Sequence, residues 1–422
     1  MPPKENHLSS TDKQLLHAAA MGILEHLQLA LQRGANPHSR DEHNNTPLHL
    51  ACMQSNSACT EALLSIENIE LNHCNDEGFS PIMCAIEYGE EDNALAILRS
   101  GKTHTLPPTC LHRASYWGQT RVVQKLCELR ICDVLQEDKQ HHTPLYYATR
   151  YGHAECLQLL LNAVPKEKLP HNLLSTAIEY LHGTCADMLL QQGGANDCPA
   201  IEKAILTEDT ASLKSAQAQL MDYRCIGNLP PLHLAAALNK CIALEALLQL
   251  QAEYVNTHDA KQNTPLHYAA MQGNEQCIRL LLRHAAIDPN VLNEEHATPL
   301  NLACWHGYSR SVQALLEHEK TDLNTADEDG WSPLCWAAYW GHTTCLQHLL
   351  HSNKHLNINQ TTESRETALH LAANKGRLDC LKLLLQTPGI NTKLKDAHGS
   401  TAIKRAKQKG HTECVKLLKS FN

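Results

Sequence analysis

The chain has 422 residues and a formal net charge of −9, with 36 Lys and Arg against 45 Asp and Glu. A mildly acidic chain lacks the clustered positive charge of nucleic-acid-binding proteins, so we expect no nucleic-acid partner. No apolar run approaches the ~18 residues of a membrane span, and the polar first fourteen residues lack the apolar core of a secretory signal. We therefore expect no membrane insertion and a cytoplasmic or nuclear location.

At the N-terminus, residues 1–12 are polar and predict a disordered lead-in. The Thr-Asp-Lys-Gln run at residues 11–14 has the form of a capping box, in which side chains satisfy the free backbone N–H groups at the start of a helix. We expect the first helix to begin there.

From this point one phrase recurs to the end of the chain, most fully as Thr-Pro-Leu-His-Tyr-Ala-Ala-Met-Gln-Gly at residues 264–273. The third residue of this phrase, which we call the anchor, has twelve equivalents in the chain, and an alanine follows each anchor three residues later. Most successive anchors are 33 to 35 residues apart. The thirteen anchor residues are Leu15, Leu48, Ile82, Leu111, Leu145, Leu174, Ile201, Leu232, Leu266, Leu300, Leu334, Leu369 and Ile403.

A repeat of this length with a T-P-L-H-x-A core resembles the ankyrin repeat. The resemblance covers almost the whole chain and implies an all-α solenoid, in which pairs of antiparallel helices stack and hairpin-like fingers join the pairs. Proline suits the first position of each helix because its φ fits and its missing N–H would be unpaired there. The glycine seven residues after most anchors suits a helix end that needs φ > 0.

Seven of the 18 cysteines keep step with the repeat, eleven residues after their anchors. A residue type that recurs in register fills one core position, where a free thiol behaves as a small hydrophobe. We therefore predict reduced, structural thiols rather than a disulfide framework. The seven are Cys59, Cys156, Cys185, Cys277, Cys345, Cys380 and Cys414.

The predicted fingers are clearest at Asp327–Pro333, where Gly330 occupies the tip, as Gly78 and Gly399 do elsewhere. Other fingers carry a different residue at this position, and Gln and Arg adopt left-handed backbone poorly. We expect irregular fingertips at Gln262 and Arg365.

The anchor spacing falls to 29, 29 and 27 residues in the middle of the chain, and the repeat around Ala204 has lost its Thr-Pro start and its cap glycine. We therefore predict an N-terminal stack over residues 13–192, a degenerate repeat or joint over residues 193–224, and a C-terminal stack over residues 225–422. The last repeat is basic, which indicates either a solvated capping face or a patch for an acidic partner.

Histidine is abundant, with 28 copies, but five follow an anchor directly, where the resemblance implies hydrogen bonds to neighbouring turns. His348, His351 and His355 would gather as zinc ligands only if a helix continued through them, and Ser352-Asn353 interrupts it. The chain has no phosphate loop, no CxxC pair and no HExxH motif. We predict no catalytic residue, no cofactor and no metal site; a Cys–His pair grafted on the array is the enzyme alternative. The five histidines are His49, His112, His233, His267 and His370.

Aromatic residues are concentrated at one position of the repeat. The resemblance implies that the two residues before the cap glycine face an inner groove and pack against nothing within the stack. Eight of these 26 positions are aromatic, although the chain has only 18 Phe, Trp and Tyr and random placement would put about one there. These rings are either anchors for a partner or padding between the first helices.

The predicted partner-binding residues come from these positions and from the fingers. Glu87, Glu179 and the fingertip residue Phe79 are further candidates, whereas Tyr147, Tyr268 and Trp336, two residues after their anchors, are predicted to be core. The partner-binding set is Tyr88, Tyr116, Trp117, Arg150, Tyr151, Tyr180, Trp305, His306, Trp331, Tyr339 and Trp340.

Our leading hypothesis is a monomeric, non-catalytic scaffold that binds partner proteins through the groove and the fingertips. A second is a microbial effector of the ankyrin-repeat type that acts on host proteins in the host cytosol. Because ankyrin-like loops can be hydroxylated at asparagine in a Leu-x5-Asn pattern, Asn196 and Asn256 are candidate modification sites.

Overall fold

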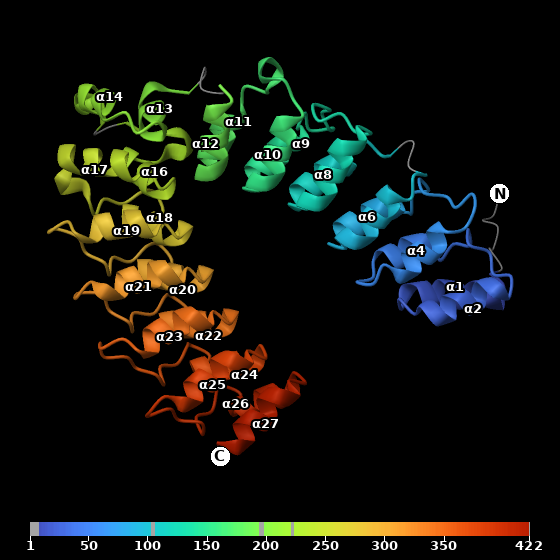
Figure 1. Cartoon of the computed structure of the whole chain (residues 1–422). Helices are drawn as coiled ribbons and strands as arrows, with labels where there is room; N and C mark the ends of the chain where they lie inside the picture. The colour runs from blue at the N-terminus through green and yellow to red at the C-terminus, as the bar shows by residue number, and fades with distance from the viewer. Residues whose placement is uncertain (1–7, 103–105, 194–197, 221–222, 422) are drawn as a thin grey trace, which may run out of the picture. The chain divides into compact units, whose positions relative to one another are not determined.

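The computed structural model of the chain describes residues 8–102, 106–193, 198–220 and 223–421. These residues form two compact units, and the boundary falls between positions 197 and 198. Within each unit the helices follow one another in sequence order, as the colour gradient shows (Figure 1).

The described residues form twenty-seven α-helices, and twenty-six of them make thirteen contacting pairs. The first helices are α1 (Ser10–Ala20), α3 (Pro47–Cys52), α5 (Pro81–Glu87), α7 (Cys110–Tyr116), α9 (Pro144–Arg150), α11 (Leu173–Glu179), α13 (Ala200–Leu206), α16 (Pro231–Ala237), α18 (Pro265–Gln272), α20 (Pro299–His306), α22 (Pro333–Trp340), α24 (Ala368–Asn374) and α26 (Ala402–Gln408). The second helices are α2 (Leu24–Gln32), α4 (Ala58–Leu64), α6 (Glu91–Arg99), α8 (Thr120–Leu129), α10 (Ala154–Asn162), α12 (Gly183–Gln191), α14 (Thr210–Ser215), α17 (Cys241–Leu250), α19 (Glu275–Leu282), α21 (Ser309–Glu317), α23 (Thr343–Leu350), α25 (Leu378–Gln386) and α27 (Thr412–Ser420). The loops contain α15 (Gln217–Leu220) and three 3-10 turns, η1 (Lys166–Lys168), η2 (Ile226–Asn228) and η3 (Ala252–Tyr254).

The pairs stack in two layers within each unit. Inside a unit, each first helix contacts the first helix of the next pair, and each second helix contacts the next second helix. In the second unit the two layers are visible side by side, with α18, α20 and α22 in one and α19, α21 and α23 in the other (Figure 1). The predicted all-α solenoid of paired helices is therefore confirmed.

Helix α18 shows why the recurring phrase forms a helix. The side chain of Thr264 accepts a hydrogen bond from the backbone N–H of His267, and Pro265 occupies the first turn. The helix ends at Gly273, whose φ of 74° is left-handed. Glycine adopts that conformation without the steric cost that a Cβ brings, so the predicted start and stop signals are both used.

The anchors and the alanines that follow them form the core between repeats. All thirteen anchors lie in first helices, and twelve are buried; Ile403 is half-buried. Every alanine at the third position after an anchor is buried. The seven cysteines in register are buried too, which confirms that they fill one core position. Each buried leucine contributes roughly 1.5–3 kcal/mol of stability.

The five histidines that follow the anchors join each repeat to the next finger, as predicted. The Nδ1 atom of His267 accepts a hydrogen bond from the backbone N–H of Thr264 at 3.1 Å, and its Nε2–H donates to the carbonyl of Ala297 at 3.1 Å. The Nε2–H of His233 donates in the same way to Asn263 at 3.0 Å. Both nitrogens of His267 are therefore engaged in the neutral form of its ring.

The fingers are more regular than the sequence indicates. The tip residues Gln262 and Arg365 have φ values of 60° and 56°, the same left-handed region that Gly330 occupies at 78°. Our expectation of irregular fingertips there is wrong. In the finger before α18, the Asp259 carboxylate accepts the N–H groups of Lys261 and Asn263 at 2.9 and 2.8 Å and holds the turn in place.

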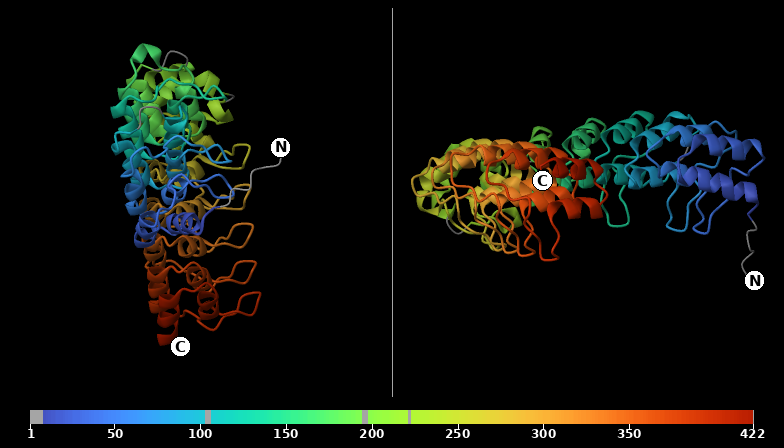
Figure 2. Two further views of the ribbon diagram at one scale, coloured as in Figure 1. Left: turned by 90° about the vertical axis from the view of Figure 1, so that its right-hand side faces the viewer. Right: turned by 90° about the horizontal axis from the view of Figure 1, so that it is seen from below.

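Neighbouring fingers are joined to one another through their backbones. The N–H of Glu328 donates to the carbonyl of Glu295 at 3.1 Å, and the N–H of Glu363 donates to the carbonyl of Asp329 at 3.0 Å. The fingers of the second unit accordingly project from one edge of its helical stack (Figure 2, left). They form a continuous surface rather than separate loops.

The start of the first helix and the boundary between the two units differ from the prediction. Helix α1 begins at Ser10, inside the predicted lead-in, and its capping box pairs Ser9 with Asp12 rather than starting at Thr11. Within the segment 193–224, α13 and α14 pack against α16 and α17, so the described part of this degenerate repeat belongs to the second unit. Residues 1–7, 194–197 and 221–222 lie outside the described part of the chain.

The buried histidines predict a loss of stability in acid. Burial lowers the pKa of His49, His233 and His267 from 6.5 to about 4, so each ring is neutral in the folded chain but protonates below pH 6.5 in the unfolded chain. The stability that each ring contributes is complete above pH 6.5 and is lost as the pH falls toward 4. At pH 5 each ring costs about 2 kcal/mol of unfolding free energy.

Replacement of His267 by Asn tests this linkage, because Asn301 already occupies the equivalent position in the next repeat and donates to the carbonyl of Trp331 at 3.0 Å. In urea denaturation, H267N is expected to keep its pH 7 stability within about 1 kcal/mol and to lose about 2 kcal/mol less than the wild type at pH 5. The exposed His43 gives a control variant, H43N, with no change in the pH profile. An H267N profile identical to that of the wild type would contradict the assignment.

Candidate protein-interaction surface

The ends of the first helices carry most of the predicted site residues. Helix α7 ends at Tyr116 with Trp117 as its cap, and α22 ends with Tyr339 and Trp340. Each pair stands directly before a glycine of positive φ, Gly118 or Gly341. The turn of the chain at this glycine leaves the preceding side chains at the end of the first-helix layer.

The next repeat holds the backbone of these helix ends in place. The Nε2–H of His342 donates to the carbonyl of Trp305 at 3.1 Å, and the Nε2–H of His153 donates to that of Tyr116 at 2.9 Å. His182 bonds Arg150 in the same way at 2.9 Å. A carbonyl oxygen only accepts, so each ring carries its proton on Nε2. These histidines follow the residue of positive φ that ends a first helix, Gly152, Leu181 or Gly341, a position that the sequence analysis did not single out.

The first unit contains one connected group of rings, the N-terminal cluster. Tyr116 lies at its centre, with its ring centroid 4.9 Å from Trp117, 4.5 Å from Tyr151 and 6.0 Å from Tyr147. Tyr146 packs against Tyr147 at 5.6 Å. The cluster comprises Arg113, Tyr116, Trp117, Tyr146, Tyr147, Arg150, Tyr151 and Tyr180.

Two arginines supply the positive charge of the N-terminal cluster. The guanidinium of Arg150 lies 4.9 Å from the ring centroid of Tyr180 and 5.8 Å from that of Tyr151, and it donates to the hydroxyl of Tyr146 at 3.0 Å. That hydrogen bond raises the pKa of Arg150. Arg113 lies over Tyr116. The rings of this cluster are therefore already bound to cations of the chain itself.

A carboxylate anchors the other side of the N-terminal cluster. Glu87, at the end of α5, pairs with Arg113 and accepts the indole N–H of Trp117 at 3.1 Å. Burial and a hydrogen bond with Tyr116 raise the pKa of Tyr151, so this ring stays neutral. The predicted polar residue Glu87 thus orients Trp117 from the neighbouring repeat.

The second unit contains a larger stack of rings, the C-terminal cluster. Trp336 lies at its centre, with its ring centroid 4.9 Å from Trp305 and 4.4 Å from Trp331, and the Trp305 ring stacks on His306 at 5.6 Å. The edge of Tyr339 meets Trp331 at 5.1 Å. The cluster comprises Trp305, His306, Tyr308, Trp331, Trp336, Tyr339 and Trp340.

The C-terminal cluster is tied to a finger rather than to a neighbouring helix end. The indole N–H of Trp336 donates to the carboxylate of Asp327 at 2.8 Å, nine residues earlier. Burial raises the pKa of Asp327. Tyr147 and Tyr268 make the same bond to Asp138 and Asp259, each at 2.6 Å.

The predicted residues lie at or near the surface. Tyr88, Trp117, Trp340 and Tyr151 keep 58%, 49%, 43% and 40% of their surface exposed, which is enough to meet a partner directly. Tyr116 is half-buried beneath its neighbours. Arg150, Tyr180, Trp305, Trp331 and Tyr339 are half-buried as well, and His306 is exposed. The two clusters include ten of the eleven predicted residues, and no ring contact in the described part of the chain joins Tyr88 to either one.

Sequence reasoning missed five members of the clusters, Arg113, Tyr146, Tyr147, Tyr308 and Trp336. Trp336 and Tyr147 were predicted to be core, yet both are half-buried and join the surface rings; only Tyr268, 7% exposed, is core. The aspartate nine residues before each of these three rings is a signal for a hydrogen bond to the finger. It does not separate the buried Tyr268 from the half-buried Tyr147 and Trp336.

The described residues contain few groups suited to metal binding or nucleophilic catalysis. No group of three or more His, Cys, Asp and Glu in this part of the chain could hold a metal ion, and none of its helices is long and apolar enough to cross a membrane. Burial raises the pKa of the thiols in the repeat register, such as Cys345, to about 11. Such thiols are poor nucleophiles at neutral pH.

Asn256 has a structural role in the second unit. Its Nδ2 donates to the carbonyl of Ala286 at 2.6 Å and its Oδ1 accepts the N–H of Asp288 at 3.0 Å. Asn290, Asn324 and Asn359 repeat this pair of bonds, which join each loop to the next. Asn196 lies outside the described residues. Hydroxylation of either residue stays a prediction.

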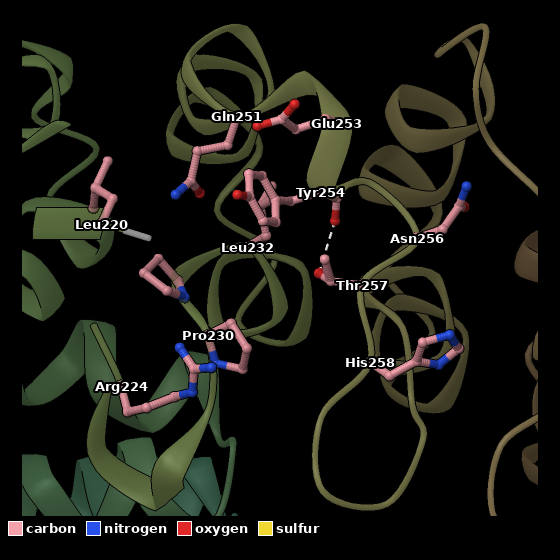
Figure 3. A pocket seen from close by; sticks show the side chains of 11 residues that line it. Leu220, Arg224, Pro230, Leu232, Gln251, Glu253, Tyr254, Asn256, Thr257 and His258 are labelled. Carbon is pink, nitrogen blue, oxygen red and sulfur yellow. Dashed lines mark hydrogen bonds between the residues drawn. The ribbon is translucent and has the colours of Figure 1, made fainter. Parts of the chain in front are cut away.

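A cavity of about 510 Å³ lies in the second unit where the degenerate repeat meets the next one. Figure 3 shows Tyr254 and Leu232 toward its centre and Arg224 at its edge, with Thr257 bonded to the carbonyl of Tyr254 at 2.8 Å. None of the eleven predicted residues lines it. The cavity is therefore separate from the aromatic clusters.

The family model described as "Ankyrin repeats (3 copies)" matches almost the whole chain. Its overlapping matches cover residues 15–108, 95–168, 111–200, 170–293, 232–327, 286–362 and 334–422. Among solved structures, the ankyrin repeat domain of Bcl-3 is similar, with a TM-score of 0.47 and 24% identity over 53% of this chain and 99% of that one.

Curated relatives match only segments of the chain. It is 37% identical to rabankyrin-5 of Mus musculus over 82 residues, 19% of this chain and 7% of that protein. It is 28% identical to alpha-latrotoxin-Lh1a of Latrodectus hasselti over 173 residues, 38% of this chain and 13% of that protein. The chain thus spans a small part of the length of these relatives.

The cap glycine of the preceding repeat leaves room for each of these histidine rings, and two variants test this. A Cβ at Gly307, whose φ is 78°, would lie 2.5 Å from Nδ1 of His342, whereas one at Gly410, with φ 77°, would meet nothing within 4 Å. Gly410→Ala is expected to cost about 1 kcal/mol for its φ, and Gly307→Ala about 2–4 kcal/mol because His342 must move. Urea denaturation measures both, and tryptophan fluorescence reports on the Trp305 stack. Equal losses would show that the histidine contact is unimportant.

Proposed function

Because the chain belongs to the ankyrin-repeat family, we propose that it is a non-catalytic scaffold that binds partner proteins through its two aromatic clusters. Ankyrin repeats are a protein–protein interaction module. The observation that carries the proposal is the position of the large rings, which gather at the ends of first helices and along a finger while remaining partly exposed.

The rings suit binding because they are large and already held in place. Aromatic residues are enriched among the residues that dominate interface energies. Trp117 is oriented by its bond to Glu87, and Trp336 by its bond to Asp327. Side chains that are ordered before binding lose less conformational entropy when the partner docks, so more of the contact energy appears as affinity.

The proposal includes a cytoplasmic setting. Its support is the eighteen free cysteines, thirteen of which are buried in the helical layers or under the loops. Disulfides form and persist in oxidising compartments, whereas reduced thiols in such number suit a reducing one. A partner would accordingly be an intracellular protein.

Removal of the two exposed tryptophans tests the proposal. Trp117→Ala and Trp340→Ala, one in each cluster, are expected to reduce partner capture by the full chain at least about tenfold when combined, since an aromatic anchor is worth ~2 kcal/mol or more. Crosslinking from cell lysate followed by quantitative mass spectrometry measures the loss. Both side chains are nearly half exposed, so the melting temperature and the helical content should change little.

Ile242→Ala is the matched control, because Ile242 keeps 56% of its surface exposed on second helix α17, away from both clusters. This variant should capture partners as the wild type does. Capture that survives the loss of both tryptophans, or falls equally with Ile242→Ala, would disprove the proposed surface.

A further inference from the structure

The fingers before α20, α22 and α24 surround the C-terminal cluster with negative charge. Five of their carboxylates are exposed, and none is paired with a cation among the described residues. The basic side chains on the same fingers are His296 and Arg365, both exposed. The five carboxylates belong to Glu294, Glu295, Glu328, Asp329 and Glu363.

These carboxylates and the rings belong to one rigid surface. Trp331 lies in the same turn as Glu328 and Asp329, and its ring stacks on Trp336. The backbone bonds from Glu328 to the finger before it and from Glu363 to Asp329 join the three tips. A ligand on the tryptophan stack would therefore lie beside the carboxylates.

The two clusters differ in what their rings can accept. In the N-terminal cluster Arg150 and Arg113 already lie over the tyrosine rings. In the C-terminal cluster the ammonium of Lys375 lies 4.5 Å from the centroid of Tyr339, which shows that its rings suit a cation. Among the described residues no cation covers the stacked rings of Trp305, Trp331 and Trp336.

We propose that the C-terminal cluster binds a cationic peptide segment of a partner protein, rich in Arg and Lys. Guanidinium and ammonium groups would lie against the exposed ring of Trp340 and the open edge of the tryptophan stack, where cation–π attraction is available, and the fingertip carboxylates would neutralise the remaining charge. This inference rests on the proposed function and names the partner class for one of its two clusters.

Fluorescence anisotropy with the full chain tests it, using a fluorescein-labelled peptide of alternating Arg, Leu, Lys and Ala and the same peptide with Glu in place of each Arg and Lys. Only the basic peptide is expected to bind. The variant Glu328→Gln/Asp329→Asn/Glu363→Gln should weaken it about tenfold, and Trp340→Ala should also weaken it. The matched control, Glu42→Gln/Asp76→Asn/Glu77→Gln on the exposed fingers of the first unit, should stay within about twofold of the wild type.

Equal binding of the acidic peptide, or equal weakening by the two sets of fingertip variants, would overturn the inference. So would capture of a tagged second copy of this chain through the same carboxylates in place of the peptide, since its last repeat is basic. If Trp117→Ala with Trp340→Ala abolishes protein capture while the basic peptide fails to bind, the inference falls and the proposed function stands. If those variants leave capture unchanged, the proposed function itself falls.

Two thiols in the second unit lie close together. The Sγ atoms of Cys241 and Cys277 lie 3.1 Å apart, although the residues belong to successive second helices, α17 and α19. Cys241 is the half-exposed first residue of its helix, and Cys277 is buried. The hydrogen bond with Cys277 lowers the pKa of Cys241, which favours its thiolate.

We infer that these two cysteines are a site of reversible oxidation by a peroxide. The thiolate of Cys241 attacks one peroxide oxygen, the O–O bond breaks, and a sulfenic acid forms as the first water leaves. Cys277, held 3.1 Å away, then attacks the sulfenic sulfur; its proton passes to the departing hydroxide, which leaves as the second water, and a disulfide joins the two repeats. Overall two thiols and one hydrogen peroxide give one disulfide and two waters. The sulfurs need to approach by only about 1 Å to reach bonding distance.

Treatment of the full chain with hydrogen peroxide, alkylation of the remaining thiols and peptide mapping tests this site. A peptide pair linked through Cys241 and Cys277 is expected, restored to free thiols by dithiothreitol and absent in Cys241→Ser. The buried Cys345 and Cys380 of other repeats should be recovered alkylated after unfolding. Oxidation of the exposed Cys74 without any linked pair would overturn the inference.

Discussion

The bond from a buried imidazole to a backbone carbonyl of the following finger is the contact on which this solenoid depends. A pair of short helices cannot bury its own apolar face, so stability must come from neighbours in register. His267, His49 and His370 set that register because both nitrogens of each ring have fixed partners, one within the repeat and one in the next. Asn301 makes the same two connections with an amide, which shows that the geometry is required rather than the imidazole.

A second ladder, at the other end of the first helices, controls where the aromatic side chains lie. A histidine at the start of the turn between the two helices donates to a carbonyl at the end of the preceding repeat's first helix, at Tyr116, Arg150 and Trp305. Because the cap glycine of that preceding repeat has no Cβ, the ring passes directly over it. The backbone that carries each exposed ring is thereby held by the neighbouring repeat, and the rings are presented in a fixed arrangement before any partner arrives.

The two clusters present different chemistry on the same scaffold. In the first unit, tyrosines surround arginines of the chain, and Glu87 balances Arg113. In the second unit, tryptophans stack from a finger to the helix ends, and the nearby fingertips are acidic.

The sequence by itself determined the repeat, the helix boundaries and most of the candidate surface. These features depend on local signals: the anchor and alanine spacing, proline at helix starts, glycine at helix ends, and aromatic residues recurring at one position. Only the tertiary structure decided the roles of Tyr147 and Trp336, which reach a finger aspartate instead of the core, and of Gln262 and Arg365, whose fingers are regular. The physical reason is that these outcomes depend on hydrogen bonds made across a turn or between repeats. Such bonds compete with burial and with backbone preference. The residue type at one position does not show whether the hydrogen bond or the burial of its side chain is the stronger effect.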